Sequence, residues 1–277
     1  MAQQEESVKA EYQEEQIQEY RQLGEVGEAV IEELLNYKQP VSVNNLLAAD
    51  MLMNRSGFLY KKLNEFTKPA DQEKVKNALS HLQESMTDKE STQEAYEEMQ
   101  QVYEDVLKEA ENGTGIQYID LKAIQSCQRQ LTLAGNLSKE ENYRIPVEIN
   151  GETTAIHLKV LHGEEGGMVK AALSTESYGD VAAQFSVRNQ KLTGYIACST
   201  QEGTSRLQDK EETLRSAFEK HVESLVQNDV EIGSVGILHS KELDLNSFTA
   251  GEPSGESSVK TADLYQIAKA FITTITA

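Results

Sequence analysis

Residues 144–161, RIPVEINGETTAIHLKVL, decide which kind of fold this chain can form. Apolar and polar residues alternate on both sides of Asn150-Gly151, which is the pattern of strands with one buried face. Asn-Gly suits a type I′ turn, because both central residues of that turn need positive φ. The stretch therefore predicts a tight antiparallel hairpin, with strands over residues 144–150 and 153–161.

The alternation continues towards the C-terminus. Glycines at 163–167 predict a turn into a strand at 168–174, and a further hairpin joins strands at 180–187 and 191–198. A helix is expected over residues 203–227, since one face of it would carry Leu207, Leu214, Phe218, Val222 and Leu225. With a last strand at 230–239, these elements predict an α+β domain in which three to five antiparallel strands are covered by one long helix.

Upstream of this domain the sequence has helical periodicity. A first helix is expected over residues 11–37, where two glycines on the apolar stripe favour close packing or a break. Asn44 is the expected cap of a second helix, and Thr87 with Glu90 has the spacing of a capping box. The expected helices after the first span 44–53, 56–66, 71–86, 87–112 and 118–133.

The domain organisation follows from this change from helical periodicity to strand alternation. Residues 1–140 form an acidic helical region, since residues 1–143 carry 27 acidic and 14 basic side chains. Residues 144–240 form the α+β domain, which we expect to fold independently, and 241–260 is a Gly/Ser/Pro linker. Residues 261–277 form an amphipathic C-terminal helix, predicted to fold back on the domain. Its apolar face carries Leu264, Ile267, Ala268, Phe271 and Ile275.

The charge of the chain excludes several classes of function. Forty-six acidic and 26 basic side chains leave a net charge of −20. Nucleic-acid binding is not expected, because its affinity comes mainly from Lys and Arg neutralising phosphates. The sequence has no apolar run of the ~20 residues that span a bilayer, and its acidic N-terminus is unlike a cleavable signal peptide. We therefore expect a cytoplasmic protein without membrane insertion.

A catalytic site is not expected either. None of the five histidines has a metal-ligand partner at a suitable spacing, and no phosphate-binding loop or nucleophile-elbow motif is present in the sequence. Cys127 and Cys198 are predicted to be buried as small hydrophobic residues. The sequence thus predicts no catalytic, cofactor-binding or metal-binding residue, and it favours a protein that is not an enzyme.

Residues 173–225 resemble the C-terminal domain of bacterial flagellar hook-length control proteins of the FliK type. That family has a Leu-x-Pro-x-x-Leu-Gly-x-Val segment, and Leu173, Gly179 and Val181 match it here. Thr175 replaces the family's proline and Tyr178 its second leucine. The strands that follow, the Leu214-Arg215 pair in the helix and the closing strand at 231–238 also fit the family.

The resemblance implies a non-enzymatic flagellar protein, exported through the flagellar type III apparatus, that controls hook length. Its implied partners are the cytoplasmic domain of an export-gate component, on which it would switch substrate choice from hook to filament subunits, and hook or hook-cap proteins. We expect binding to the gate through Tyr178, Gly179, Asp180 and Val181 and the adjoining strand edge, since glycine permits close backbone approach and tyrosine is frequent in binding hot spots.

Two other functions stay open from the residues alone. One is a cytosolic acidic adaptor or chaperone-like protein that uses the helical region as its binding surface. The other is an enzyme whose site is built from residues scattered along the sequence.

Overall fold

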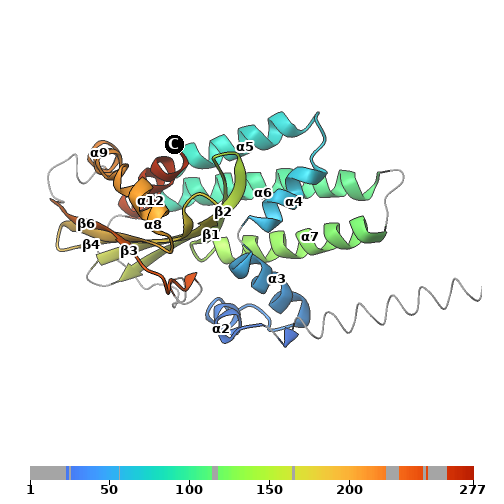
Figure 1. Ribbon diagram of the computed structural model, residues 1–277. Coiled ribbons are helices and arrows are strands. Elements are labelled where there is room, and N and C mark those ends of the chain that lie inside the picture. Colours follow the sequence, from blue (N-terminus) through green and yellow to red (C-terminus); the bar gives the residue numbers. More distant parts are fainter. Residues whose placement is uncertain are drawn as a thin grey trace, which may run out of the picture.

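The computed structural model describes residues 23–24, 26–55, 57–113, 118–163, 166–222, 231–245, 248 and 261–277. Its N-terminal half is helical: α2 (Glu28–Asn36), α3 (Val43–Asn54), α4 (Phe58–Phe66), α5 (Gln72–Glu84), α6 (Lys89–Glu111) and α7 (Tyr118–Ser138). Helices α4 to α7 stand together beside the sheet (Figure 1). The helical region was predicted from periodicity, and the change from helices to strands, expected between residues 140 and 144, occurs between Ser138 and Asn142.

Two predicted caps are wrong, and part of the first helix lies outside the described residues. Ser42, not Asn44, caps α3, and its side chain accepts a hydrogen bond from the Asn45 N–H. Asp88 caps α6 by accepting from the Ser91 N–H, in place of the expected Thr87–Glu90 box. Within the described part of the predicted 11–37 helix, α2 begins only after Gly27, so the glycines mark a break.

The chain then forms one six-stranded sheet: β1 (Asn142–Ile149), β2 (Glu152–Gly163), β3 (Gly166–Thr175), β4 (Gly179–Arg188), β5 (Lys191–Cys198) and β6 (Glu231–His239). The strands lie in sequence order, antiparallel except for the parallel pair β5–β6. The β1–β2 hairpin was predicted correctly, since Asn150 and Gly151 have φ of 53° and 80°. The sheet has one strand more than the three to five expected.

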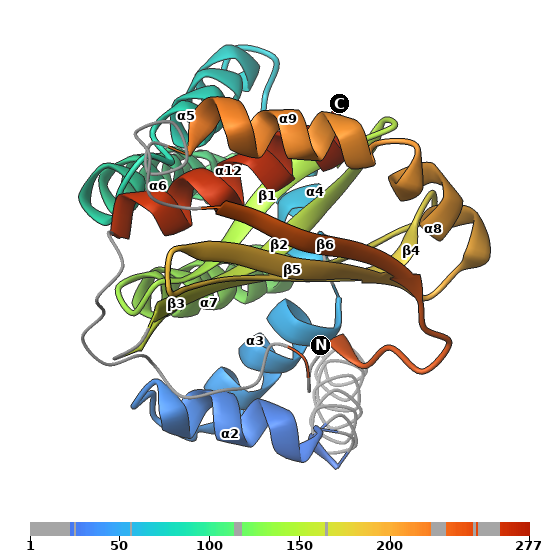
Figure 2. The same ribbon diagram turned by 90° about the vertical axis from the view of Figure 1, so that its left-hand side faces the viewer.

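Among the described residues after β5, the helices with given bounds are α8 (Gln201–Gln208), α9 (Glu211–His221) and, at the C-terminus, α12 (Thr261–Thr276). The single helix predicted over 203–227 is therefore wrong in its described part, where it breaks at Asp209-Lys210. The break lets α8 pack on β5 and β6 while α9 lies along α12. Figure 2 shows α9 and α12 over one side of the sheet and α2 and α3 on the other side.

The sheet has one apolar and one polar face, because side chains alternate along each strand. The apolar face carries Tyr143, Ile145, Leu158, Val169, Phe185 and Ile196, all of them buried. On this face the Phe185 ring meets Phe218 of α9 at 5.2 Å and Phe271 of α12 at 5.7 Å between ring centroids.

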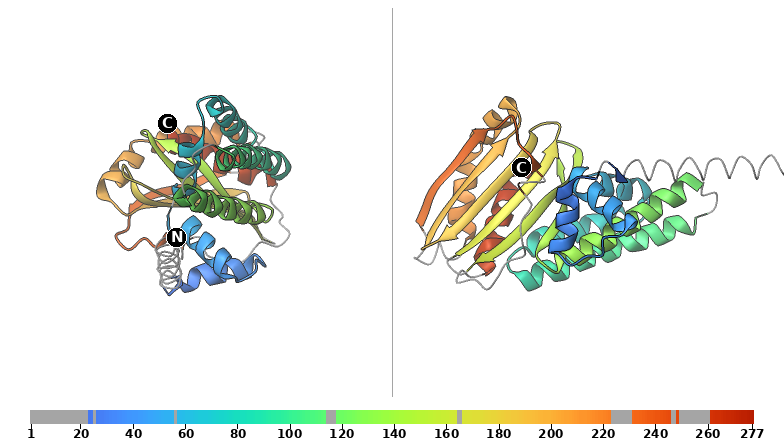
Figure 3. Two further views of the ribbon diagram at one scale, coloured as in Figure 1. Left: turned by 90° about the vertical axis from the view of Figure 1, so that its right-hand side faces the viewer. Right: turned by 90° about the horizontal axis from the view of Figure 1, so that it is seen from below.

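Helix α12 therefore lies in the main core, and Figure 3 shows this helix against the sheet when seen from below. Its Leu264, Tyr265 and Ile267 are fully buried. The expected folding back of the C-terminal helix is confirmed. The predicted 144–240 unit, however, completes its core with a helix from outside it.

At Arg144, the outer edge of β1 is closed by the helical region. Val160 N–H donates to Glu141 O, so by alternation the N–H and C=O of Arg144 point away from β2. Tyr60 Oη donates to Arg144 O at 2.6 Å, and Tyr96 Oη accepts from Arg144 N–H at 3.3 Å. Two residues further on, Pro146 has no N–H to leave unpaired. This edge is thus unavailable at Arg144 to any other strand.

Helix α4 approaches the sheet through a glycine. Gly57 has a φ of +79°, and a Cβ atom there would lie 2.5 Å from Thr154 Cα and 2.7 Å from Thr153 O. Only glycine permits both this backbone conformation and this approach to β2. Gly57 therefore sets the position from which Tyr60, one turn later, reaches Arg144.

The two tyrosine hydroxyls should stabilise the fold measurably. Replacing Tyr60 and Tyr96 together by Phe keeps both rings but leaves the buried Arg144 N–H and C=O without partners, which should lower the free energy of unfolding by about 2–4 kcal/mol. Urea denaturation measures the loss. Tyr103→Phe is the control, because its hydroxyl lies 3.5 Å from Asn64 Oδ1 and should cost less than about 1 kcal/mol. Equal losses would contradict the assigned role of the edge.

Candidate interaction surface

The segment predicted to bind a partner, Tyr178 to Val181, is buried. Tyr178 is 4% exposed and Val181 is fully buried, and Gly179 has a left-handed φ of +71°. The Tyr178 N–H donates to Thr175 Oγ1, and its C=O accepts from Thr200 Oγ1 at 3.0 Å. This backbone is the turn between β3 and β4, and its hydrogen bonds hold it against the start of α8.

The predicted site is therefore corrected. Strand β4 is paired with β3 on one side and with β5 on the other, so no strand edge adjoins Tyr178. A Cβ atom at Gly203 of α8 would lie 2.2 Å from Tyr178 O, which shows how closely α8 covers the turn. Asp180 is half-buried, and its N–H donates to Ser199 Oγ. The sequence located the glycine turn, but it could not show that a helix covers it.

The available strand edge belongs to β6. Glu231 N–H and Ser240 N–H donate to Gln190 O and Cys198 O of the β5 side. Backbone groups along β6 point alternately towards β5 and away from it, with one bulge between the two bonded ends. The N–H and C=O groups of Val235, Ile237 and His239 therefore point outward. Within the described part of the chain no hydrogen bond reaches these outward groups.

Side chains on β6 also fit an interaction edge. Leu238 is 43% exposed, and Ile232, Val235 and Ile237 are only partly buried. Between Ile232 and His239 the strand has no charged residue and no proline. Natural sheets normally protect an open edge with charges, proline or a covering element. Strand β1 carries Pro146 and two charged residues, Arg144 and Glu148, whereas the only charged residue of β6 is Glu231, at its start.

A buried ionic cluster lies beneath α2 on the polar face of the sheet. Lys159 Nζ donates to Glu33 Oε2 at 2.7 Å, and Arg144 Nη2 lies 3.9 Å from Glu33 Oε1. Burial lowers the pKa of Lys159 to about 8, although Glu33 opposes the shift. Burial, with the charges of Arg144 and Lys159, holds the pKa of His157 well below its usual range.

This cluster combines residue types that active sites use, but it faces the protein interior. Glu33, Arg144 and Lys159 are at most 2% exposed, so α2 would have to move before a solute could reach them. Its arrangement joins α2 to β1 and β2. The cluster could not be predicted from local sequence patterns, because Glu33 lies 126 residues before Lys159.

A second buried carboxylate, Glu141, joins four elements. His162 Nε2 lies 2.9 Å from Glu141 Oε1, Lys89 Nζ donates to Oε2 at 3.2 Å, and Tyr265 Oη donates to Oε1 at 3.1 Å. Burial raises the pKa of Glu141, but His162 and Lys89 outweigh burial and bring it below its ordinary value. Glu141 thus connects α6, the start of β1, β2 and the C-terminal helix.

Replacing Glu141 by Gln should destabilise the chain in a pH-dependent way. Because the folded-state pKa is below the unfolded one, the stabilisation from Glu141 is present above about pH 4.3 and is lost as pH falls through the folded pKa. We expect a loss of about 1–3 kcal/mol at pH 7 that shrinks towards zero in acid, measured by urea denaturation. Exposed Glu140→Gln is the control, and a gap independent of pH would contradict the assignment.

The two cysteines offer no exposed thiol. Cys127 and Cys198 are buried, as predicted, and burial raises the pKa of each thiol to about 11. In the described ranges no three His, Cys, Asp or Glu residues gather as metal ligands would. Nor has any described helix the length and apolar content to cross a bilayer.

Comparison with known proteins gives no relative. The chain matches no protein-family model, no curated protein and no solved structure. The hook-length resemblance of residues 173–225 therefore stays a prediction, and the function has to be argued from the geometry of the surface.

Proposed function

We propose that this chain is a non-enzymatic binding protein whose β6 edge accepts a strand from a partner protein. The observation that carries the proposal is the row of outward backbone groups at Val235, Ile237 and His239, to which no described residue bonds. Strand addition at a sheet edge uses such main-chain groups for affinity and neighbouring side chains for specificity. Exposed Leu238, on the same strand, supplies an apolar contact.

The resemblance of residues 173–225 supplies the identity of the partner. By this resemblance, the partner is the cytoplasmic domain of a flagellar export-gate component. Binding to it would control hook length and switch export from hook to filament subunits. The proposal moves the contact from Tyr178 to β6, the strand that closes the region of resemblance.

The experiment introduces lysine on the edge without touching the ladder. The first variant, Leu238→Lys, changes an exposed side chain. The second is Gly236→Lys, since an added Cβ atom at Gly236 would meet nothing within 4 Å. Each variant should keep its unfolding midpoint but bind the export-gate domain at least about tenfold more weakly, since a charge on an edge opposes strand pairing. Calorimetric titration measures binding, and cells carrying the variants should build overlong hooks.

Leu35→Lys is the matched control, because Leu35 is 60% exposed and lies on α2. It makes the same change of side chain and charge away from β6. Unchanged affinity in the Leu238 and Gly236 variants would contradict the β6 site. Failure of the wild-type chain to bind the export-gate domain would contradict the flagellar partner.

One observation favours the adaptor function as a second candidate. Of the five large hydrophobic side chains that are most exposed in the described structure, four lie within residues 31–43: Ile31, Leu35, Val41 and Val43. Exposed apolar groups that gather in one region often mark an interaction site. If Leu35→Lys abolishes binding to partners from the cell while Leu238→Lys does not, the helical region is the binding surface.

A further inference from the structure

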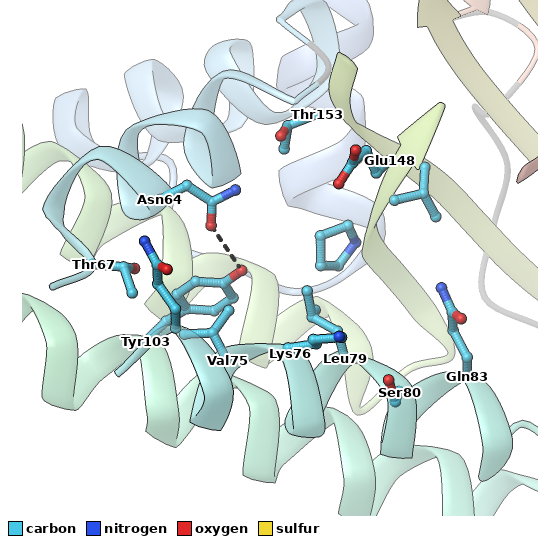
Figure 4. A pocket seen from close by; sticks show the side chains of 13 residues that line it. Asn64, Thr67, Val75, Lys76, Leu79, Ser80, Gln83, Tyr103, Glu148 and Thr153 are labelled. Atoms are coloured by element: carbon cyan, nitrogen blue, oxygen red, sulfur yellow. Dashed lines mark hydrogen bonds between the residues drawn. The ribbon is translucent and has the colours of Figure 1, made fainter. Parts of the chain in front are cut away.

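A cleft separates α5 from the far end of β1, on the side of the molecule opposite β6. It has a volume of about 460 Å³, within the ~300–1,000 Å³ of typical ligand sites. Figure 4 shows side chains from α5, the end of α4 and the β1–β2 hairpin converging on it. None of these residues belongs to the surface proposed above.

The cleft has an apolar floor and a polar rim with one charge of each sign. Val75, Leu79, Pro146 and Val147 line it with apolar groups, and Tyr103 reaches across towards Asn64 (Figure 4). Around them lie three amides and three hydroxyls, from Asn64, Gln72, Gln83, Thr67, Ser80 and Thr153. Amides and hydroxyls can both donate and accept, so this rim suits a ligand that presents both kinds of group.

The wall formed by β1 offers free main-chain groups. Backbone groups along β1 point alternately towards β2 and away from it, and those of Arg144 point away. The same alternation turns away the C=O of Pro146 and both the N–H and C=O of Glu148. The tyrosine hydroxyls reach only Arg144. Within the described residues, no hydrogen bond is made to the outward groups of Pro146 and Glu148.

The charges at the rim are balanced. Lys76 and Glu148 both line the cleft, and neither forms an ion pair with another described residue. A phosphate or a multivalent cation would meet one repelling charge here and has no cluster of ligands. A peptide meets none of these obstacles, because its backbone is neutral and carries alternate donors and acceptors.

We propose that this cleft binds an extended peptide segment of a partner protein, which lies along the outer edge of β1. The peptide accepts a hydrogen bond from Glu148 N–H and donates to the carbonyls of Pro146 and Glu148. Alternate side chains of the peptide enter the floor at Val75 and Leu79, while the others face solvent. Rim amides pair with the peptide groups that face α5.

A random 12-residue peptide library displayed on phage is the probe, panned against the full chain. Enriched peptides should show alternating apolar and polar residues, and their fluorescein-labelled forms should bind in anisotropy titrations. Ser80→Arg fills the cleft from its exposed rim and should weaken binding at least about tenfold. Asn77→Arg is the matched control, since Asn77 is an exposed residue on the same helix and outside the cleft, and it should bind as wild type does.

The backbone contact is tested on the peptide itself. Methylation of one peptide nitrogen that faces β1 should remove binding, whereas methylation of its neighbour should not. No enrichment above an uncoated surface, or equal binding to the Ser80→Arg variant, would overturn the proposal. Peptides whose binding is lost in Leu238→Lys instead would place the peptide on β6, which would overturn the cleft site and leave the proposed function standing.

Discussion

An open β-sheet has two edges, and the rest of this structure depends on how each edge is treated. At β1, the hydroxyls of Tyr60 and Tyr96 bond to Arg144, and Pro146 leaves no donor unpaired. The bundle of α4 and α6 must therefore stand where it does, because its tyrosines complete the sheet. At β6, no described residue bonds to the outward groups. The helical region thus closes the β1 edge at Arg144, whereas the described structure leaves the outward groups of β6 to a partner.

The buried charges also have a structural role, on the β1 side of the sheet. A buried ion pair adds little net stability, because desolvation offsets most of the attraction. Removing one partner is nevertheless costly, so Glu33 and Glu141 fix where their neighbours must lie. Glu33 holds α2 against Arg144 and Lys159 on the polar face, and Glu141 holds the C-terminal helix through Tyr265. Both carboxylates thus specify the arrangement of helices around β1 and β2.

Much of the fold could be predicted from the sequence, since its signals are local. The Asn150-Gly151 hairpin, the helical first half and the apolar face of α12 depend on turn chemistry and on periodicity within a few residues. The failures depend on distant residues. From the sequence, Tyr178 is predicted to be an available aromatic residue, but in the fold α8 covers it. The helix predicted over 203–227 is broken in its described part, where α8 and α9 pack on different elements. The cleft and the Glu33 cluster combine residues far apart in sequence.

Residue-resolved amide hydrogen exchange tests the central claim most directly, since the claim concerns single N–H groups. In the free chain, Arg144 N–H should be protected as strongly as the inward amides of β1, because Tyr96 accepts from it. The outward N–H groups of Val235, Ile237 and His239 should exchange much faster than the inward amide of Leu238 on the same strand, and they should become protected when a partner strand binds. Equal protection of outward and inward β6 amides in the free chain would contradict the account, because the edge would then be covered already.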